Sequence, residues 1–90
     1  MPNVKFTPNL KRFYPDLDTG QFNGENVAEL LDNINQKYSG IKDYIVDEQG
    51  ELRKHVNIFI GNEMVKDKIK LTDHLSDDDE VYILQALSGG

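Results

Sequence analysis

The chain has 90 residues, of which 38% are hydrophobic, and a formal net charge of −6 at pH 7. A chain of this length and composition can bury one modest core, so we expect a single domain. The absence of cysteine excludes disulfides and cysteine-based zinc sites, and the acidic balance with scattered lysine and arginine residues disfavours nucleic-acid binding.

The first ten residues contain neither a long apolar run nor a basic leader followed by a small-residue cleavage pattern. They therefore predict no signal peptide and no membrane span. We expect a cytoplasmic protein with no membrane association that is a monomer when free.

The N-terminal quarter predicts a hairpin. Apolar and polar side chains alternate in residues 3–7, which predicts a half-buried strand ended by Pro8. Residues 9–22 are rich in Pro, Asp and Gly, and they predict a loop that leads into a short second strand around Gln21 and Phe22.

Residues 25–40 carry the clearest helical pattern. The N-terminal signal comes from Asn23, or from Glu25 and Asn26, and Gly40 lies where the end of a helix favours a residue that tolerates positive φ. The apolar side chains that form one stripe at helical spacing are Val27, Leu30, Leu31, Ile34 and Tyr38.

The second half predicts three more strands. Residues 41–54 predict an irregular or short helical turn followed by a turn at Gln49–Gly50, and the alternation in 56–60 predicts a central strand. A turn and a short strand near Met64–Val65 follow. Residues 71–80 predict a short helical turn and a tight loop. The last strand places Val81 and Ile83 on one face and Tyr82, Leu84 and Ala86 on the other.

The order β-β-α-β-β-β with one substantial helix predicts an α+β fold, a roll of the ubiquitin-like β-grasp type. A mixed sheet would pack on the main helix, with the first and last strands adjacent in its middle. We expect residues 1–86 to form the β-grasp domain and residues 87–90 to form an extended, flexible C-terminal tail that ends in Gly-Gly.

Four motifs resemble those of the MoaD/ThiS-type ubiquitin-like sulfur carriers. They are "YSGI" after the helix, "VNIFI" followed by a turn and a short strand, "LSDDDEVYIL", and the terminal "GG". Their spacing is most similar to that of the branch that serves cysteine biosynthesis. The chain departs from the family pattern at Asp78, where the family usually has Gly, and at Gln85, where it often has Pro.

The resemblance implies that the chain is a sulfur carrier, and so a protein co-substrate rather than an enzyme. An ATP-dependent, ubiquitin-activating-type enzyme would adenylate Gly90, next to Gly89, and a sulfur donor would convert the adenylate into a thiocarboxylate. A sulfur-accepting enzyme of cysteine, molybdopterin, thiamine or similar biosynthesis would then take the sulfur. ATP would be used by the activating enzyme, with no cofactor or metal bound by the chain. The alternative is a ubiquitin-like modifier that is joined through Gly90 to target lysines.

Strand parity predicts a partner-binding surface beside the tail. If the Val81 and Ile83 face packs on the helix, apolar side chains on the opposite face form an exposed patch. The predicted partner-binding residues are Phe59, Met64, Tyr82, Leu84 and Ala86, with Leu87 and Ser88 in the tail. The alternatives are that the 41–54 segment covers these residues, or that they are scattered over the surface without a binding role.

Three other motifs lead to weaker hypotheses. "LDTG" at 17–20 matches the aspartic-protease tripeptide but does not end an apolar strand, and a long helix does not suit that all-β architecture. "SDDDE" at 76–80 lacks the spacing of a calcium loop. His55 and His74 have no neighbouring ligand pair, so no metal site is predicted.

Overall fold

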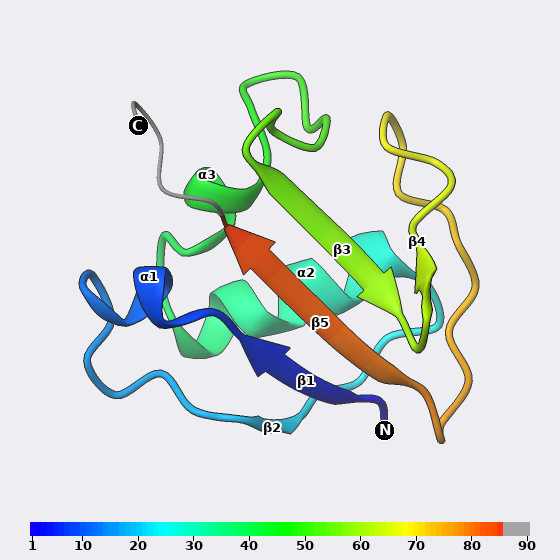
Figure 1. Cartoon of the computed structure of the whole chain (residues 1–90), viewed down its shortest axis with the longest axis horizontal. Helices are drawn as coiled ribbons and strands as arrows, with labels where there is room; N and C mark the ends of the chain where they lie inside the picture. The colour runs from blue at the N-terminus through cyan, green and yellow to red at the C-terminus, as the bar shows by residue number, and fades with distance from the viewer. Residues whose placement is uncertain (86–90) are drawn as a thin grey trace.

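A computed structural model describes residues 1–85, which form a five-stranded mixed sheet with one long helix across one of its faces (Figure 1). This is the α+β, ubiquitin-like β-grasp roll expected from the sequence. The elements are β1 (Asn3–Phe6), α1 (Pro8–Lys11), β2 (Gly20–Gln21), α2 (Val27–Lys37), α3 (Lys42–Ile45), β3 (Val56–Ile60), β4 (Glu63–Met64) and β5 (Glu80–Gln85).

The strand order is β2-β1-β5-β3-β4, so the last strand lies in the middle of the sheet. β5 pairs in parallel with β1 and antiparallel with β3, which confirms that the first and last strands are neighbours. Because β5 has a hydrogen-bonded neighbour on each side, its end is fixed up to Gln85.

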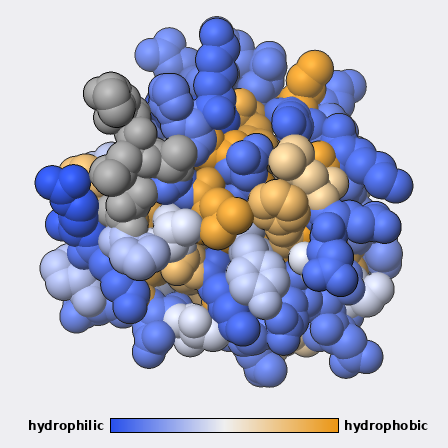
Figure 2. All heavy atoms as spheres, in the orientation of Figure 1, coloured by the Kyte–Doolittle hydropathy of each residue, from blue (hydrophilic) through white to orange (hydrophobic). Residues whose placement is uncertain are grey.

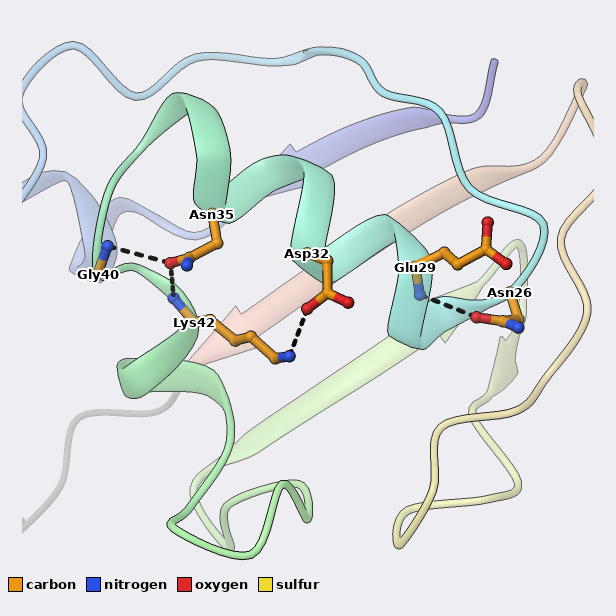
Figure 3. A network of polar contacts seen from close by, with 6 residues as sticks. All are labelled: Asn26, Glu29, Asp32, Asn35, Gly40 and Lys42. Carbon is orange, nitrogen blue, oxygen red and sulfur yellow. Dashed lines mark hydrogen bonds and ion pairs between the residues drawn. The ribbon is translucent and has the colours of Figure 1, made fainter.

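Helix α2 begins at the predicted place because Asn26 caps it. The Asn26 side-chain oxygen accepts a hydrogen bond from the Glu29 N–H at 2.8 Å. At the other end, Gly40 has φ +89°, and the Asn35 side-chain oxygen accepts from the backbone N–H groups of Gly40 and Lys42 (Figure 3). These bonds fix the direction in which the chain leaves the helix.

The core lies between α2 and the inner face of the sheet. Val4, Ile58, Val81 and Ile83 contribute fully buried side chains from β1, β3 and β5, and the apolar stripe of α2 packs against them. Gly24 lets the loop before α2 approach the helix, because a Cβ atom there would come within 2.8 Å of the Leu30 backbone.

Two short segments differ from the sequence-based expectation. Pro8 ends β1, but it also starts α1 within the segment expected to be only a loop, because proline suits the first position of a helix. β2 begins at Gly20, so the predicted strand at Gln21 and Phe22 is one residue too late.

The helical turn expected in residues 71–80 is wrong. The Leu71 and Asp73 carbonyls accept hydrogen bonds from the N–H groups of Ala28 and Val27 at the start of α2. These carbonyls satisfy helix-end donors that have no partner within α2, and the segment runs extended to do so. His74 forms an isolated bridge with Asn26.

Leu71, not Asp78, carries the unusual backbone conformation. Among residues 1–85, Leu71 is the non-glycine residue with positive φ (56°), so the family's glycine position at Asp78 does not need left-handed backbone in this chain. The left-handed conformation costs about 1–2 kcal/mol for an L-residue. The buried side chain of Leu71 and the two backbone hydrogen bonds that it makes hold it there.

Within residues 1–85, no helix has the length and apolar character needed to cross a membrane.

Candidate functional site: the outer face of the sheet and the end of β5

The outer face of the sheet, opposite α2, carries an apolar stripe formed by Met64, Phe59, Tyr82 and Leu84. Phe59 in β3 lies directly across from Met64 in β4 and from Tyr82 in β5. Leu84 lies two residues after Tyr82, on the same face of β5. The register therefore brings together four side chains that are up to 25 positions apart in sequence.

The apolar stripe is open to solvent. Met64 is 41% exposed and Leu84 is 37% exposed, while Phe59 and Tyr82 are half-buried. Figure 2 shows apolar atoms gathered over β5 and β3 with polar side chains around them. Segment 41–54 instead packs Ile41, Ile45 and Val46 into the core. An exposed apolar surface with a polar rim is typical of a protein-binding site.

A polar group borders the stripe on β1. The Lys5 ammonium lies 5.3 Å from the centre of the Tyr82 ring, and the Tyr82 hydroxyl donates to Glu80 Oε2 at 2.8 Å. Lys5 Nζ is also 4.0 Å from the same oxygen. These contacts hold the Tyr82 ring in place and combine an apolar ring face with a polar edge.

The end of β5 is held on three sides. The Gln85 N–H donates to Thr7 Oγ1 at 3.1 Å, Gln85 pairs with Val56, and its side-chain amide donates to the Tyr44 carbonyl at 3.5 Å. Gln85, the last residue that the structure describes, therefore has a defined position between β1, β3 and α3. Ala86, Leu87, Ser88, Gly89 and Gly90, all predicted site residues, lie outside the described residues.

An aromatic cluster beside the end of β5 was not anticipated from the sequence. Phe13 stacks on Tyr44 with ring centroids 4.7 Å apart, and Phe13 is 54% exposed. Tyr14 meets Tyr44 edge-on and donates a hydrogen bond from its hydroxyl to the Ser39 carbonyl. Burial is the largest cause that raises the pKa of Tyr14, and electrostatic repulsion from Tyr44 and Asp43 adds to it. The rings come from segments 30 residues apart that share no periodic pattern.

The family profile described as ThiS matches residues 11–90, which is most of the chain and includes the terminal glycines. The chain belongs to the ThiS family. The similarity covers the strands that build the apolar stripe as well as the tail.

The individual proteins that this chain resembles include sulfur carrier proteins and a small modifier protein. The sulfur carrier protein CysO of Mycobacterium tuberculosis is 32% identical over 69 residues, which is 74% of either chain. CysO in the crystal structure of the Amycolatopsis orientalis BexX/CysO complex superposes with a TM-score of 0.84 at 25% identity, covering both chains fully. Small archaeal modifier protein 1 of Methanosarcina acetivorans gives a TM-score of 0.77 at 29% identity, covering 98% of this chain and 94% of that one.

Proposed function

We propose that this sulfur carrier protein of the ThiS/CysO type works through its C-terminal carboxylate. Gly90 is adenylated by an ATP-dependent, ubiquitin-activating-type enzyme and is converted to a thiocarboxylate, which donates its sulfur in a biosynthetic pathway such as that of cysteine, molybdopterin or thiamine. The observation that carries the proposal is the ThiS-family match, which runs through Gly89 to Gly90. The chain acts as a co-substrate of two enzymes.

The two steps follow from carboxylate chemistry. A terminal carboxylate has a pKa of roughly 3.3–3.7, so at neutral pH it is ionised and a poor electrophile. Attack of a carboxylate oxygen on the α-phosphorus of ATP expels pyrophosphate and leaves an acyl-adenylate. A donor that supplies sulfur at the oxidation level of hydrosulfide then attacks the acyl carbon and expels AMP, which leaves a thiocarboxylate at Gly90 with no oxidant or reductant consumed. The chain has no cysteine, so the sulfur travels on the carboxyl group rather than on a thiol.

The apolar stripe supplies the affinity that the tail lacks. Two residues without side chains suit a narrow channel in the partner but offer few contacts of their own, and ordering them costs conformational entropy. Tyr82 and Leu84 lie on β5, the strand that leads to the tail, and Phe59 lies directly across from Tyr82 on β3, so a partner that takes up the tail meets them at the same time. The crystallised complex of BexX with CysO supports a protein partner.

A modifier function is the alternative because one of the structural relatives is a small archaeal modifier protein. The activation step is common to both functions. In the modifier case a lysine amine, rather than a sulfur donor, attacks the acyl carbon and expels AMP, and an isopeptide bond forms with loss of a proton from the amine.

The decisive experiment is intact-mass measurement after incubation with ATP, the adenylating enzyme of the same organism and a sulfur source. We expect one oxygen of the wild-type chain to be replaced by sulfur, and we expect no change in a variant that lacks Gly90. A stable isopeptide adduct without thiocarboxylate would favour the modifier function.

A matched control appends one residue after Gly90. This variant should lose the reaction while its thermal stability stays close to that of the wild type. A large loss of stability would show instead that the terminal glycines have a structural role.

A further inference from the structure

Half of the basic side chains gather on two neighbouring loops, although they appear scattered in the sequence. Residues 52–71 contain five of the ten lysine and arginine residues and two of the sixteen acidic residues. The five lie in residues 52–55 and 66–70, which we term the basic loop pair. The Leu52 N–H donates to the Lys68 carbonyl at 2.8 Å and ties the two loops together, at the end of the sheet where β3 begins (Figure 1).

The cations of the basic loop pair are available to a partner. Arg53, Lys54, Lys66, Lys68 and Lys70 are all exposed, and none of them forms an ion pair within residues 1–85. Arg53 Nε donates a hydrogen bond to the Asp43 backbone carbonyl at 2.9 Å, which does not neutralise the charge of the guanidinium. The nearby carboxylates are engaged with the backbone. Asp67 accepts hydrogen bonds from Ile69, Lys70 and Thr72, and Asp73 accepts from the N–H groups of Lys66 and Asp67.

An exposed apolar side chain projects from the same turn. Ile69 is 61% exposed, the largest fraction for any large hydrophobic residue among residues 1–85, and it lies between Lys68 and Lys70. The Asp67 hydrogen bonds and the buried Leu71 fix the turn on both sides of it. A surface held in one conformation loses little entropy on binding.

The basic loop pair also continues the functional surface. Val56 pairs with Gln85, so residues 53–55 lie beside the end of β5. Met64 of the apolar stripe is two residues before Lys66. A protein that covers the stripe and receives the tail therefore comes close to both loops.

We propose that the basic loop pair is a second contact surface for the activating enzyme, where Ile69 enters an apolar pocket whose rim carries aspartate and glutamate. This inference rests on the proposed function, and it holds for the carrier and the modifier alike because both need activation. The rest of the chain is strongly acidic, so an acidic partner surface would be repelled elsewhere and attracted only here, which sets the orientation of docking. The two loops contain no Phe, Tyr or Trp on which nucleic-acid bases could stack.

The test is ATP–pyrophosphate exchange by the adenylating enzyme of the same organism, with this chain as the varied substrate. We expect K68E/K70E to raise KM about tenfold or more at low salt, with kcat unchanged, and to flatten the rise of KM with ionic strength. The matched control is K11E/K37E, which makes the same charge change on α1 and α2 and should stay near the wild type. I69S should also raise KM, whereas the conservative variant I69V should keep KM near the wild-type value. Circular dichroism checks that each variant is folded.

The outcomes separate this inference from the proposed function. An inactive wild type, or an active variant that lacks Gly90, would mean that the proposed function itself fails. An active wild type with equal KM values for K68E/K70E and K11E/K37E would overturn the inference alone. Binding of a labelled single-stranded oligonucleotide that K68E/K70E abolishes, with unchanged exchange kinetics, would assign the loops to nucleic acid and would also overturn it.

Discussion

The two faces of β5 belong to different parts of the molecule, although they alternate residue by residue. Ile83 is fully buried against the α2 side of the sheet, while its neighbour Leu84 is 37% exposed on the outer face. The same alternation holds in β3, where Ile58 is fully buried and Phe59 is half-buried on the outer face. Because side chains of a strand point alternately to the two faces, one set can specify the core and the other can specify the partner surface. The two sets should therefore respond separately to mutation.

The largest effect on stability is expected at the inner face. Ile83→Ala removes buried methyl and methylene groups from a site that packed neighbours surround, and it should lower the free energy of unfolding by about 2–5 kcal/mol. Urea denaturation measures the change. The control is Leu84→Ala on the outer face, where the loss should be much smaller. Equal losses for the two variants would contradict the division between the faces.

Leu84→Asp should weaken binding of the partner and leave the stability of the fold nearly unchanged. The substitution places a charge in the apolar stripe and should raise KM for the activating enzyme about tenfold, or about 1.4 kcal/mol of binding free energy, with little change in unfolding free energy. Gln21→Glu is the matched control, because it adds the same charge on the outer face of β2, away from the stripe. Unchanged affinity for Leu84→Asp would mean that the stripe does not contact this enzyme.

Asn26→Ala weakens the helix that covers the inner face without touching either face. Loss of the hydrogen bond from the Glu29 N–H to Asn26 Oδ1 should cost about 1 kcal/mol of unfolding free energy. Asn23→Ala tests the other capping candidate in the sequence, and it should change stability little because Asn23 accepts its hydrogen bond from Asn33 through the backbone carbonyl. Neither variant should alter KM. A change in KM would show that helix α2, which covers the inner face, is coupled to the outer face.

Periodic segments were predictable from the sequence, and structure that depends on distant partners was not. The apolar spacing of α2 and the alternation of β3 and β5 fix their own elements, and the parity of β5 also assigned Tyr82 and Leu84 to the outer face. The extended path of residues 71–75 depends instead on helix donors more than 40 positions earlier, and no local pattern encodes that need.

Surface features were likewise predictable from the sequence only where they depend on a local pattern. The residues of the apolar stripe could be proposed because strand parity is a local property. The clustering of Arg53 and Lys54 with the lysines of 66–70 could not, because one backbone hydrogen bond between Leu52 and Lys68 brings the two loops together. The stack of Phe13 on Tyr44 likewise joins residues that the sequence gives no reason to pair.

The turn at residues 67–72 lies on neither face, and its stability should depend on pH. Hydrogen bonds from the Lys70 N–H and the Thr72 hydroxyl lower the pKa of Asp67 to about 2, well below the ordinary value for an aspartate. A carboxylate whose pKa is lower in the folded state stabilises the fold above its unfolded pKa, and this stabilisation is lost as pH falls toward the folded pKa. The stabilisation from Asp67 is therefore complete above about pH 5 and disappears between about pH 4 and pH 2.

Asp67→Asn isolates this contribution. The wild type should be more stable than the variant by a constant amount above pH 5, and the difference should shrink as pH falls from about 4 to about 2, measured by urea denaturation at each pH. Thr72→Val removes one of the donors and should raise the pKa of Asp67 part of the way toward its ordinary value, which carboxyl NMR titration can follow. A difference that stays constant down to pH 2 would show that the stability of the turn does not depend on the charge of Asp67.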